Sequence, residues 1–145
     1  MVIDRGLHGV CGTDIPGILG ETAHQGIPVF TLTTAGRTDK EAFFAAVRDA
    51  LPPDPPLGSF RMLWDALSDS LWGGLHELKS PRVIIVWPDA RPVAGAEGDF
   101  RTALSILRDV AASLAEARDT SERPTQVSVY VAPASSGGEA ASAKG

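Results

Sequence analysis

The stretch "RVIIVW", residues 82–87, is the part of the sequence that decides the fold. After the arginine, every side chain in it is apolar. A strand with one face in water alternates between apolar and polar side chains, whereas a strand that is apolar at every position is typical of burial on both faces. Residues 82–87 are therefore predicted to form a strand that is buried on both faces.

Amphipathic helices are predicted on either side of this strand in the sequence. The helix before it is predicted to run from Phe60 to Trp72 and to end at the pair Gly73-Gly74, with its apolar positions at Phe60, Leu63, Trp64, Leu67 and Leu71. The helix after it is longer and is predicted to begin at Asp99, with core-facing residues Phe100, Ala103, Leu104, Leu107, Val110 and Leu114.

Two further strands and one more helix are predicted from local composition. Residues 27–34 are rich in β-branched and aromatic side chains, and residues 126–132 alternate between apolar and polar ones, so both segments are predicted strands. Between the first of them and the helix at Phe60, the segment Thr38-Asp39-Lys40-Glu41 matches a capping box and predicts a helix start. The prolines within residues 52–56 end that helix.

The ends of the chain carry weaker signals. Residues 1–12 are glycine-rich without periodicity, so we expect a loose segment there. A helix is predicted to start at Thr13 or Asp14, with Pro16 in its first turn and Gly26 at its end. Residues 133–145 have little apolar surface to bury and are expected to be disordered.

This alternation of strands and helices predicts the α/β class. We expect a small single domain over residues 13–132, with a three-stranded parallel β-sheet packed by helices and joined by right-handed crossovers. A chain of 145 residues is long enough for one such core.

Bulk properties exclude several classes of protein. The net charge of −5, with 13 Lys and Arg in total, argues against direct nucleic-acid binding, which needs a clustered positive surface. The single cysteine, Cys11, cannot form an internal disulfide. The sequence has no stretch of about 18 apolar residues for a membrane span and no signal peptide, so we expect a cytoplasmic protein without membrane attachment.

The candidate site is a pair of carboxylates, Asp65 and Asp69, on the helix before the central strand. Their spacing of four residues places them one turn apart on one face, with Arg61 and Trp72 on the same stripe. Trp64, Leu67 and Leu71 are predicted to point inward. The pair could be a catalytic acid and base, a surface that binds a partner, or an ordinary solvated face.

The catalytic interpretation lacks companions. An acid and base need different environments across a cleft, and two residues on one exposed turn share theirs. A metal site would need a histidine or more carboxylates, and His76 is predicted to stand isolated beyond the helix. No phosphate-binding glycine loop or nucleophile elbow is found either. We therefore predict no catalytic residues, metal or cofactor, while a binding surface and a solvated face remain open.

The segment "WDALSDSL", residues 64–71, resembles the central motif of the barstar family, the intracellular inhibitors of guanyl-specific ribonucleases. That motif is approximately N-[LW]-D-A-L-x-D-x-L, and it is matched here at Trp64, Asp65, Ala66, Leu67, Asp69 and Leu71. The order of predicted elements over about residues 27–132 agrees with the family. Two departures precede the motif: Arg61 stands where glycine is usual, and Leu63 where asparagine is usual.

The resemblance implies a barstar-like fold and a protein that plugs the cationic active site of a ribonuclease with its acidic helix. It implies Asp69 as the central anchor and Asp65 as its neighbour. The further partner contacts that we predict are Ser59, Phe60, Arg61, Trp72 and Asp109. For Trp72, packing beneath the following loop is an alternative, and for Asp109, simple solvation. The free protein is expected to be a monomer.

Two other functions are compatible with the same fold. The Arg61 departure motivates an immunity protein or an interaction module that is directed at a different toxin or partner. A small enzyme that uses Asp65 and Asp69 would require a deep pocket beside their helix.

Overall fold

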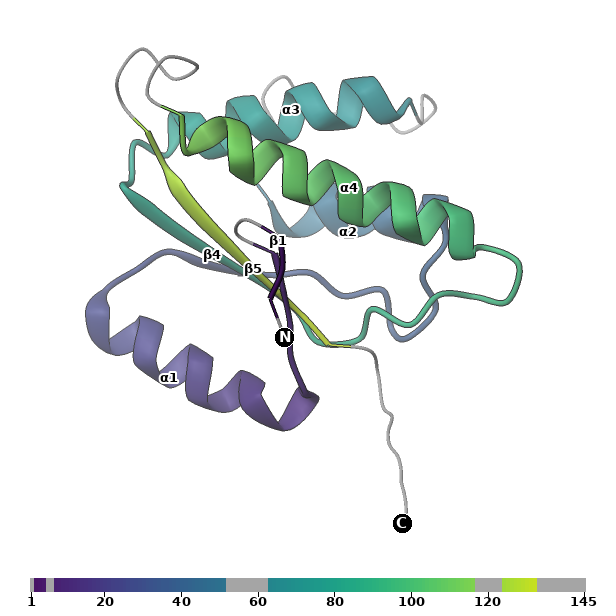
Figure 1. Ribbon diagram of the computed structural model, residues 1–145, viewed down its shortest axis with the longest axis horizontal. Helices are drawn as coiled ribbons and strands as arrows, with labels where there is room; N and C mark the ends of the chain where they lie inside the picture. The colour runs from purple at the N-terminus through teal and green to yellow at the C-terminus, as the bar shows by residue number, and fades with distance from the viewer. Residues whose placement is uncertain (1, 5–6, 52–62, 117–123, 133–145) are drawn as a thin grey trace.

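The protein, for which we use a computed structural model, has a mixed α/β fold around one β-sheet (Figure 1). The structure describes residues 2–4, 7–51, 63–116 and 124–132. Within them the sheet has five strands in the order β1-β2-β5-β4-β3. These are β1 (Val2–Asp4), β2 (Leu7–Gly9), β3 (Val29–Thr31), β4 (Arg82–Trp87) and β5 (Gln126–Val131). Strands β2, β5, β4 and β3 pair in parallel and β1 pairs antiparallel to β2, so the predicted class and parallel arrangement are confirmed.

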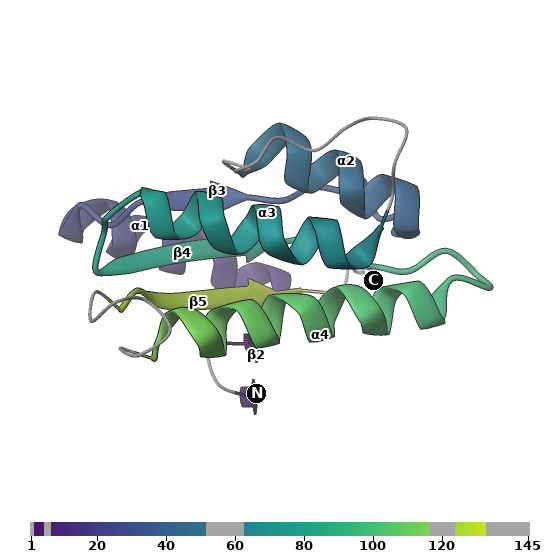
Figure 2. The same cartoon turned by 90° about the horizontal axis from the view of Figure 1, so that it is seen from above.

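Helices cover both faces of the sheet. A short 3₁₀ helix, η1 (Gly12–Asp14), leads into the first of them, and the α-helices are α1 (Ile15–Gln25), α2 (Lys40–Ala50), α3 (Trp64–Glu77) and α4 (Glu97–Leu114). Helices α2, α3 and α4 lie on one face, here called the inner face, and α1 lies on the other, the outer face (Figures 1 and 2). None of the helices in the described segments combines the length and apolar composition that crossing a bilayer requires.

Strand β4 is buried on both faces, as its uninterrupted apolar sequence predicts. Val83, Ile85 and Trp87 belong to the main core between the sheet and the inner-face helices. Ile84 and Val86 point to the outer face, where they form a second, smaller core with Ile15 of α1. All five side chains are at most 1% exposed. One strand therefore joins two cores.

The outer face needs only one helix because of the composition of β5. Alternate residues of this strand are buried in the main core, so Gln126, Ser128 and Tyr130 point outward. These polar residues can face water at little cost, in contrast to Ile84 and Val86 of β4. Tyr130 is further covered by His8 of β2, whose ring stacks on it with the centroids 5.1 Å apart.

The N-terminal prediction is wrong in part, and the sheet consequently has two more strands than predicted. Residues 2–4 and 7–9, assigned to a loose segment over residues 1–12, form β1 and β2. Leu7 is 2% exposed and lies in the main core, while β2 pairs along β5. A strand of three residues shows no periodicity, so its burial is decided by tertiary contacts. Residues 133–145, the predicted tail, lie outside the described residues.

Helix α1 begins and ends as predicted. Asp14 is its N-cap residue, with Pro16 in the first turn. Gly26 caps the C-terminus with φ +69°, a left-handed conformation that glycine adopts without steric cost.

Several helix boundaries differ from the prediction. Helix α4 begins at Glu97 rather than at Asp99, and α3 begins at Trp64, after the extended residue Leu63, rather than at Phe60. The cap of α2 is Asp39 rather than Thr38: the Asp39 Oδ1 accepts a hydrogen bond from the Ala42 N–H at 2.8 Å. Thr38 is fully buried, and its hydroxyl is hydrogen-bonded to that of Thr34. Helix α3 continues through Gly73-Gly74 to Glu77. The glycines cost about 1 kcal/mol each in helix propensity, and the complete burial of Leu75 beyond them offsets this.

A group of hydrogen bonds joins the ends of β3 and β4. The Trp87 Nε1–H donates to the Thr34 hydroxyl at 3.2 Å, and that hydroxyl donates to the Asp89 backbone carbonyl at 2.9 Å. The Asp89 carboxylate accepts from the backbone N–H groups of Thr34 and Ala35 at 3.0 and 3.1 Å. These bonds satisfy polar groups that would otherwise be costly to bury.

Candidate functional site

The acidic pair lies on the outward side of α3, as the sequence predicts. Asp65 and Asp69 are exposed, whereas Leu67 and Leu71 between and beside them are fully buried. Within the part of the chain that the structure describes, neither carboxylate has a hydrogen bond or an ion pair. Both are therefore available to a partner without first breaking an internal contact.

Helix α3 starts without a side-chain cap. Its N-cap residue is Leu63, with an extended backbone (φ −101°, ψ 126°) and no side-chain hydrogen bond to the first turn. Leu63 is 51% exposed. An asparagine at this position could accept a hydrogen bond from the first turn. The predicted contacts Ser59, Phe60 and Arg61, just before this cap, lie outside the described residues and stay predictions.

Trp64 fixes the first turn of α3 on α2. Its ring lies 5.2 Å from the Phe44 ring and 6.3 Å from the Phe43 ring, measured between centroids. The Lys40 ammonium lies 5.4 Å from the centre of the Trp64 ring and adds a cation–π contact. The turn that carries Asp65 is thereby held in place by contacts on the opposite side of the helix.

Trp72 packs against α4. It is half-buried, and its Nε1–H donates to the Ser113 hydroxyl at 3.0 Å. Its ring also stacks on His76, with centroids 4.8 Å apart and planes inclined by 20°. Trp72 therefore packs within the protein, as the alternative to a partner contact proposed, but it packs on α4 and not beneath the loop after the helix. His76, predicted to stand isolated beyond the helix, instead belongs to the last turn of α3.

Two more exposed carboxylates lie on α3 and α4. Asp109 is exposed on α4, where its Oδ1 pairs with the Nε of the adjacent Arg108 at 3.3 Å. Glu77 is exposed on the last turn of α3. The sequence reasoning missed Glu77 because it ended the helix at Gly73-Gly74. The apolar residues Leu75 and Leu78, which continue the helical spacing, were the signal that the helix went on.

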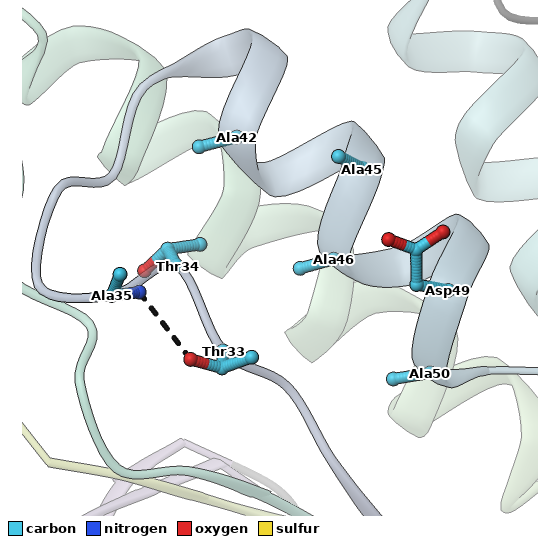
Figure 3. A pocket seen from close by; sticks show the side chains of 8 residues that line it. All are labelled: Thr33, Thr34, Ala35, Ala42, Ala45, Ala46, Asp49 and Ala50. Atoms are coloured by element: carbon cyan, nitrogen blue, oxygen red, sulfur yellow. Dashed lines mark hydrogen bonds between the residues drawn. The ribbon is translucent and has the colours of Figure 1, made fainter.

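Two cavities lined by described residues lie elsewhere. One of about 470 Å³ is situated between the end of β3 and α2, lined by Thr33, Thr34 and Ala35 on one side and mainly by alanines on the other (Figure 3). Another cavity, of about 410 Å³, lies between α1 and the strands β4 and β5. Neither is lined by Asp65 or Asp69, so these cavities give no support to an enzyme that uses the pair. The described residues include no group of three or more metal-ligating side chains.

Asp65 and Asp69 thus lie one turn apart on an exposed side of α3. A family model described as Barstar (barnase inhibitor) matches residues 27–130 of the chain. The matched span contains α2, α3 and α4, while β1, β2 and α1 precede it. Comparisons with curated proteins and with solved structures give no match.

Proposed function

This chain belongs to the barstar family, and we propose that it inhibits a guanyl-specific ribonuclease by placing the acidic side of α3 in the cationic active-site cleft. The active site of a ribonuclease binds phosphate and therefore gathers arginine, lysine and histidine side chains. Carboxylates on a helix can form charge-assisted hydrogen bonds with those cations in place of the RNA backbone. Inhibition is then steric and electrostatic, and the inhibitor performs no chemistry.

The observation that carries the proposal is the fixed, outward position of Asp65 and Asp69 within the family-matched span. Leu67 and Leu71 hold the helix from below, and Trp64 and Trp72 hold it at the side. Because these contacts already order the helix in the free protein, little conformational entropy is lost on binding.

The net charge of −5 supports association with a basic partner. The namesake pair of the family, barnase and barstar, is itself the standard example of electrostatically steered association and of carboxylate hot spots. The expectation that Asp69 dominates the affinity therefore comes from the family.

The proposal is tested by titrating the protein into barnase and following RNA cleavage. The wild-type protein should abolish cleavage near one equivalent. Asp69→Ala should weaken inhibition by roughly thirtyfold or more, the effect expected of a binding hot spot. Glu21→Ala is the matched control, because it removes an exposed carboxylate from α1 on the opposite face of the sheet.

The salt dependence of the association rate gives a second check of the proposal. Raising the ionic strength from 0.1 to 1 M shortens the Debye length from about 10 Å to about 3 Å. The association rate of the wild type should therefore fall steeply, and that of Asp69→Ala less so. Equal salt dependence of the two proteins would argue against a role of this carboxylate in steering.

The second candidate is an immunity protein or interaction module of the same fold with a different partner. It is favoured by the start of α3, where the exposed Leu63 provides no side-chain cap. Absence of inhibition across several guanyl-specific ribonucleases would support this candidate and reject the first.

A further inference from the structure

A hydrogen bond between two side chains joins helices α3 and α4. The indole N–H of Trp72 on α3 donates to the hydroxyl of Ser113 on α4, 41 residues later in the chain. The indole is held on its face as well, because it stacks on His76. Trp72 also packs on the main core, so its ring is fixed by contacts of three kinds.

This contact lies one helical turn from a carboxylate on each helix. Asp69 precedes Trp72 by three residues, and Asp109 precedes Ser113 by four. Side chains three or four residues apart share one side of an α-helix. Because α3 and α4 run side by side in both views (Figures 1 and 2), the bond keeps the turn of Asp69 next to the turn of Asp109.

Apolar side chains also pack between these helices. Leu67, Leu71 and Leu75 of α3 belong to the same core as Leu107, Val110 and Leu114 of α4. The hydrophobic effect has no directional preference, so it does not by itself specify one sliding position of the two helices. A hydrogen bond has a defined length and angle and can fix the relative position of the two helices.

We propose that Trp72 and Ser113 are positioning residues, which hold Asp109 beside Asp69 so that the surface offered to the nuclease spans two helices. The proposal rests on the proposed function. Asp109 shares its charge with Arg108, so its effect on the partner is expected to be smaller than that of Asp69.

The positional part is tested on the free protein. Spin labels are placed at Glu77→Cys on α3 and Arg101→Cys on α4, both exposed sites, in a Cys11→Ser background. Ser113→Ala and Trp72→Phe, which each remove one partner of the bond, should broaden the distance distribution between the labels. Ser113→Thr, which keeps a hydroxyl, should preserve it. The control is Ser105→Ala on the same helix, a serine to which the structure gives no hydrogen bond among the described residues. An unchanged distribution in Ser113→Ala overturns the proposal, whatever the partner is.

The functional part is tested through association rates with barnase. Introduced into the wild-type protein, Asp109→Asn should lower the rate of association with barnase roughly twofold, as expected for removal of one charge near an interface. In Ser113→Ala that effect should disappear, whereas the effect of Asp69→Asn should remain. Ser113→Thr should restore it.

These experiments distinguish a positioning role of Ser113 from a merely structural one, and both from failure of the ribonuclease assignment. If the role of Ser113 were merely structural, Ser113→Ala would lower the free energy of unfolding and leave the effect of Asp109→Asn on the association rate unchanged. That outcome, or no effect of Asp109→Asn in the wild type, overturns the proposal. Absence of any inhibition of several guanyl-specific ribonucleases, including barnase, rejects the ribonuclease assignment, while the label distances still decide whether the bond positions the two helices.

Discussion

The two faces of strand β4 lead to two differently built cores. On the inner face, Val83, Ile85 and Trp87 meet three helices. On the outer face, α1 is the only helix among the described residues that packs on Ile84 and Val86, and a cavity of about 410 Å³ adjoins Ile84. The inner-face helices belong to the span matched by the family model, whereas α1 precedes it. The inner core therefore supports the acidic helix common to the family, and the outer core depends on the N-terminal residues of this chain.

The comparison predicts its largest effect at Trp87. This side chain is fully buried, lies 5.2 Å from the Phe43 ring and 5.7 Å from the Phe100 ring between centroids, and donates a hydrogen bond to Thr34. Trp87→Ala should lower the free energy of unfolding by about 3–5 kcal/mol. Urea denaturation followed by far-UV circular dichroism measures this. A loss below about 2 kcal/mol would show that the inner core can collapse around the gap.

A smaller effect is expected at Ile84 on the other side of the same strand. Ile84→Ala should cost about 2–3 kcal/mol, near the lower end for such substitutions, because the outer core is small and open on one side. The same denaturation experiment gives the value. If Ile84→Ala proves as costly as Trp87→Ala, the proposed asymmetry between the two cores is wrong. Inhibition by the folded fraction of Ile84→Ala should be unchanged, because α3 is on the other face.

The smallest effect is expected in α1 and has the opposite sign. Gly20 lies inside the helix with open space where a Cβ would be, so Gly20→Ala should stabilise the protein by about 0.5–1 kcal/mol. Gly26→Ala on the same helix is the matched contrast, since its φ of +69° penalises any side chain. Thermal unfolding should shift upward for the first variant and downward for the second. No shift for either variant would mean that α1 does not contribute to the cooperative fold, and a downward shift for Gly20→Ala would contradict the open space at its Cβ position.

The parts of the fold with strong periodic signals could be predicted from the sequence. The uninterrupted apolar run of β4 and the helical spacing in α4 indicated burial correctly. The strands at the N-terminus could not be predicted, because Leu7 is the only large apolar residue of β2 and its burial depends on β5, more than 100 residues later. Pairing of such distant segments leaves no local pattern.

The candidate site was predictable to a similar extent. The outward position of Asp65 and Asp69 follows from their spacing and from the burial of Leu67 and Leu71. The contact between Trp72 and Ser113 does not follow, because nothing local links two residues that are 41 positions apart. The extension of α3 to Glu77 was missed because glycine propensity was weighed without the burial of Leu75.

The burial of β4 on both faces has a consequence for how the sheet assembles. In most strands a slip of one residue against a neighbour would turn the apolar side chains toward water, and this penalty selects the correct pairing. Strand β4 lacks that safeguard, because both of its sides are apolar from Val83 onward. Its two sides differ in the size of their side chains and in one polar atom. Trp87 fills the inner core, and in the observed register, where Ile84 lies opposite Val29, its indole N–H donates to the Thr34 hydroxyl. The burial of Trp87 and its hydrogen bond to Thr34 therefore favour the observed register of β4 in the sheet.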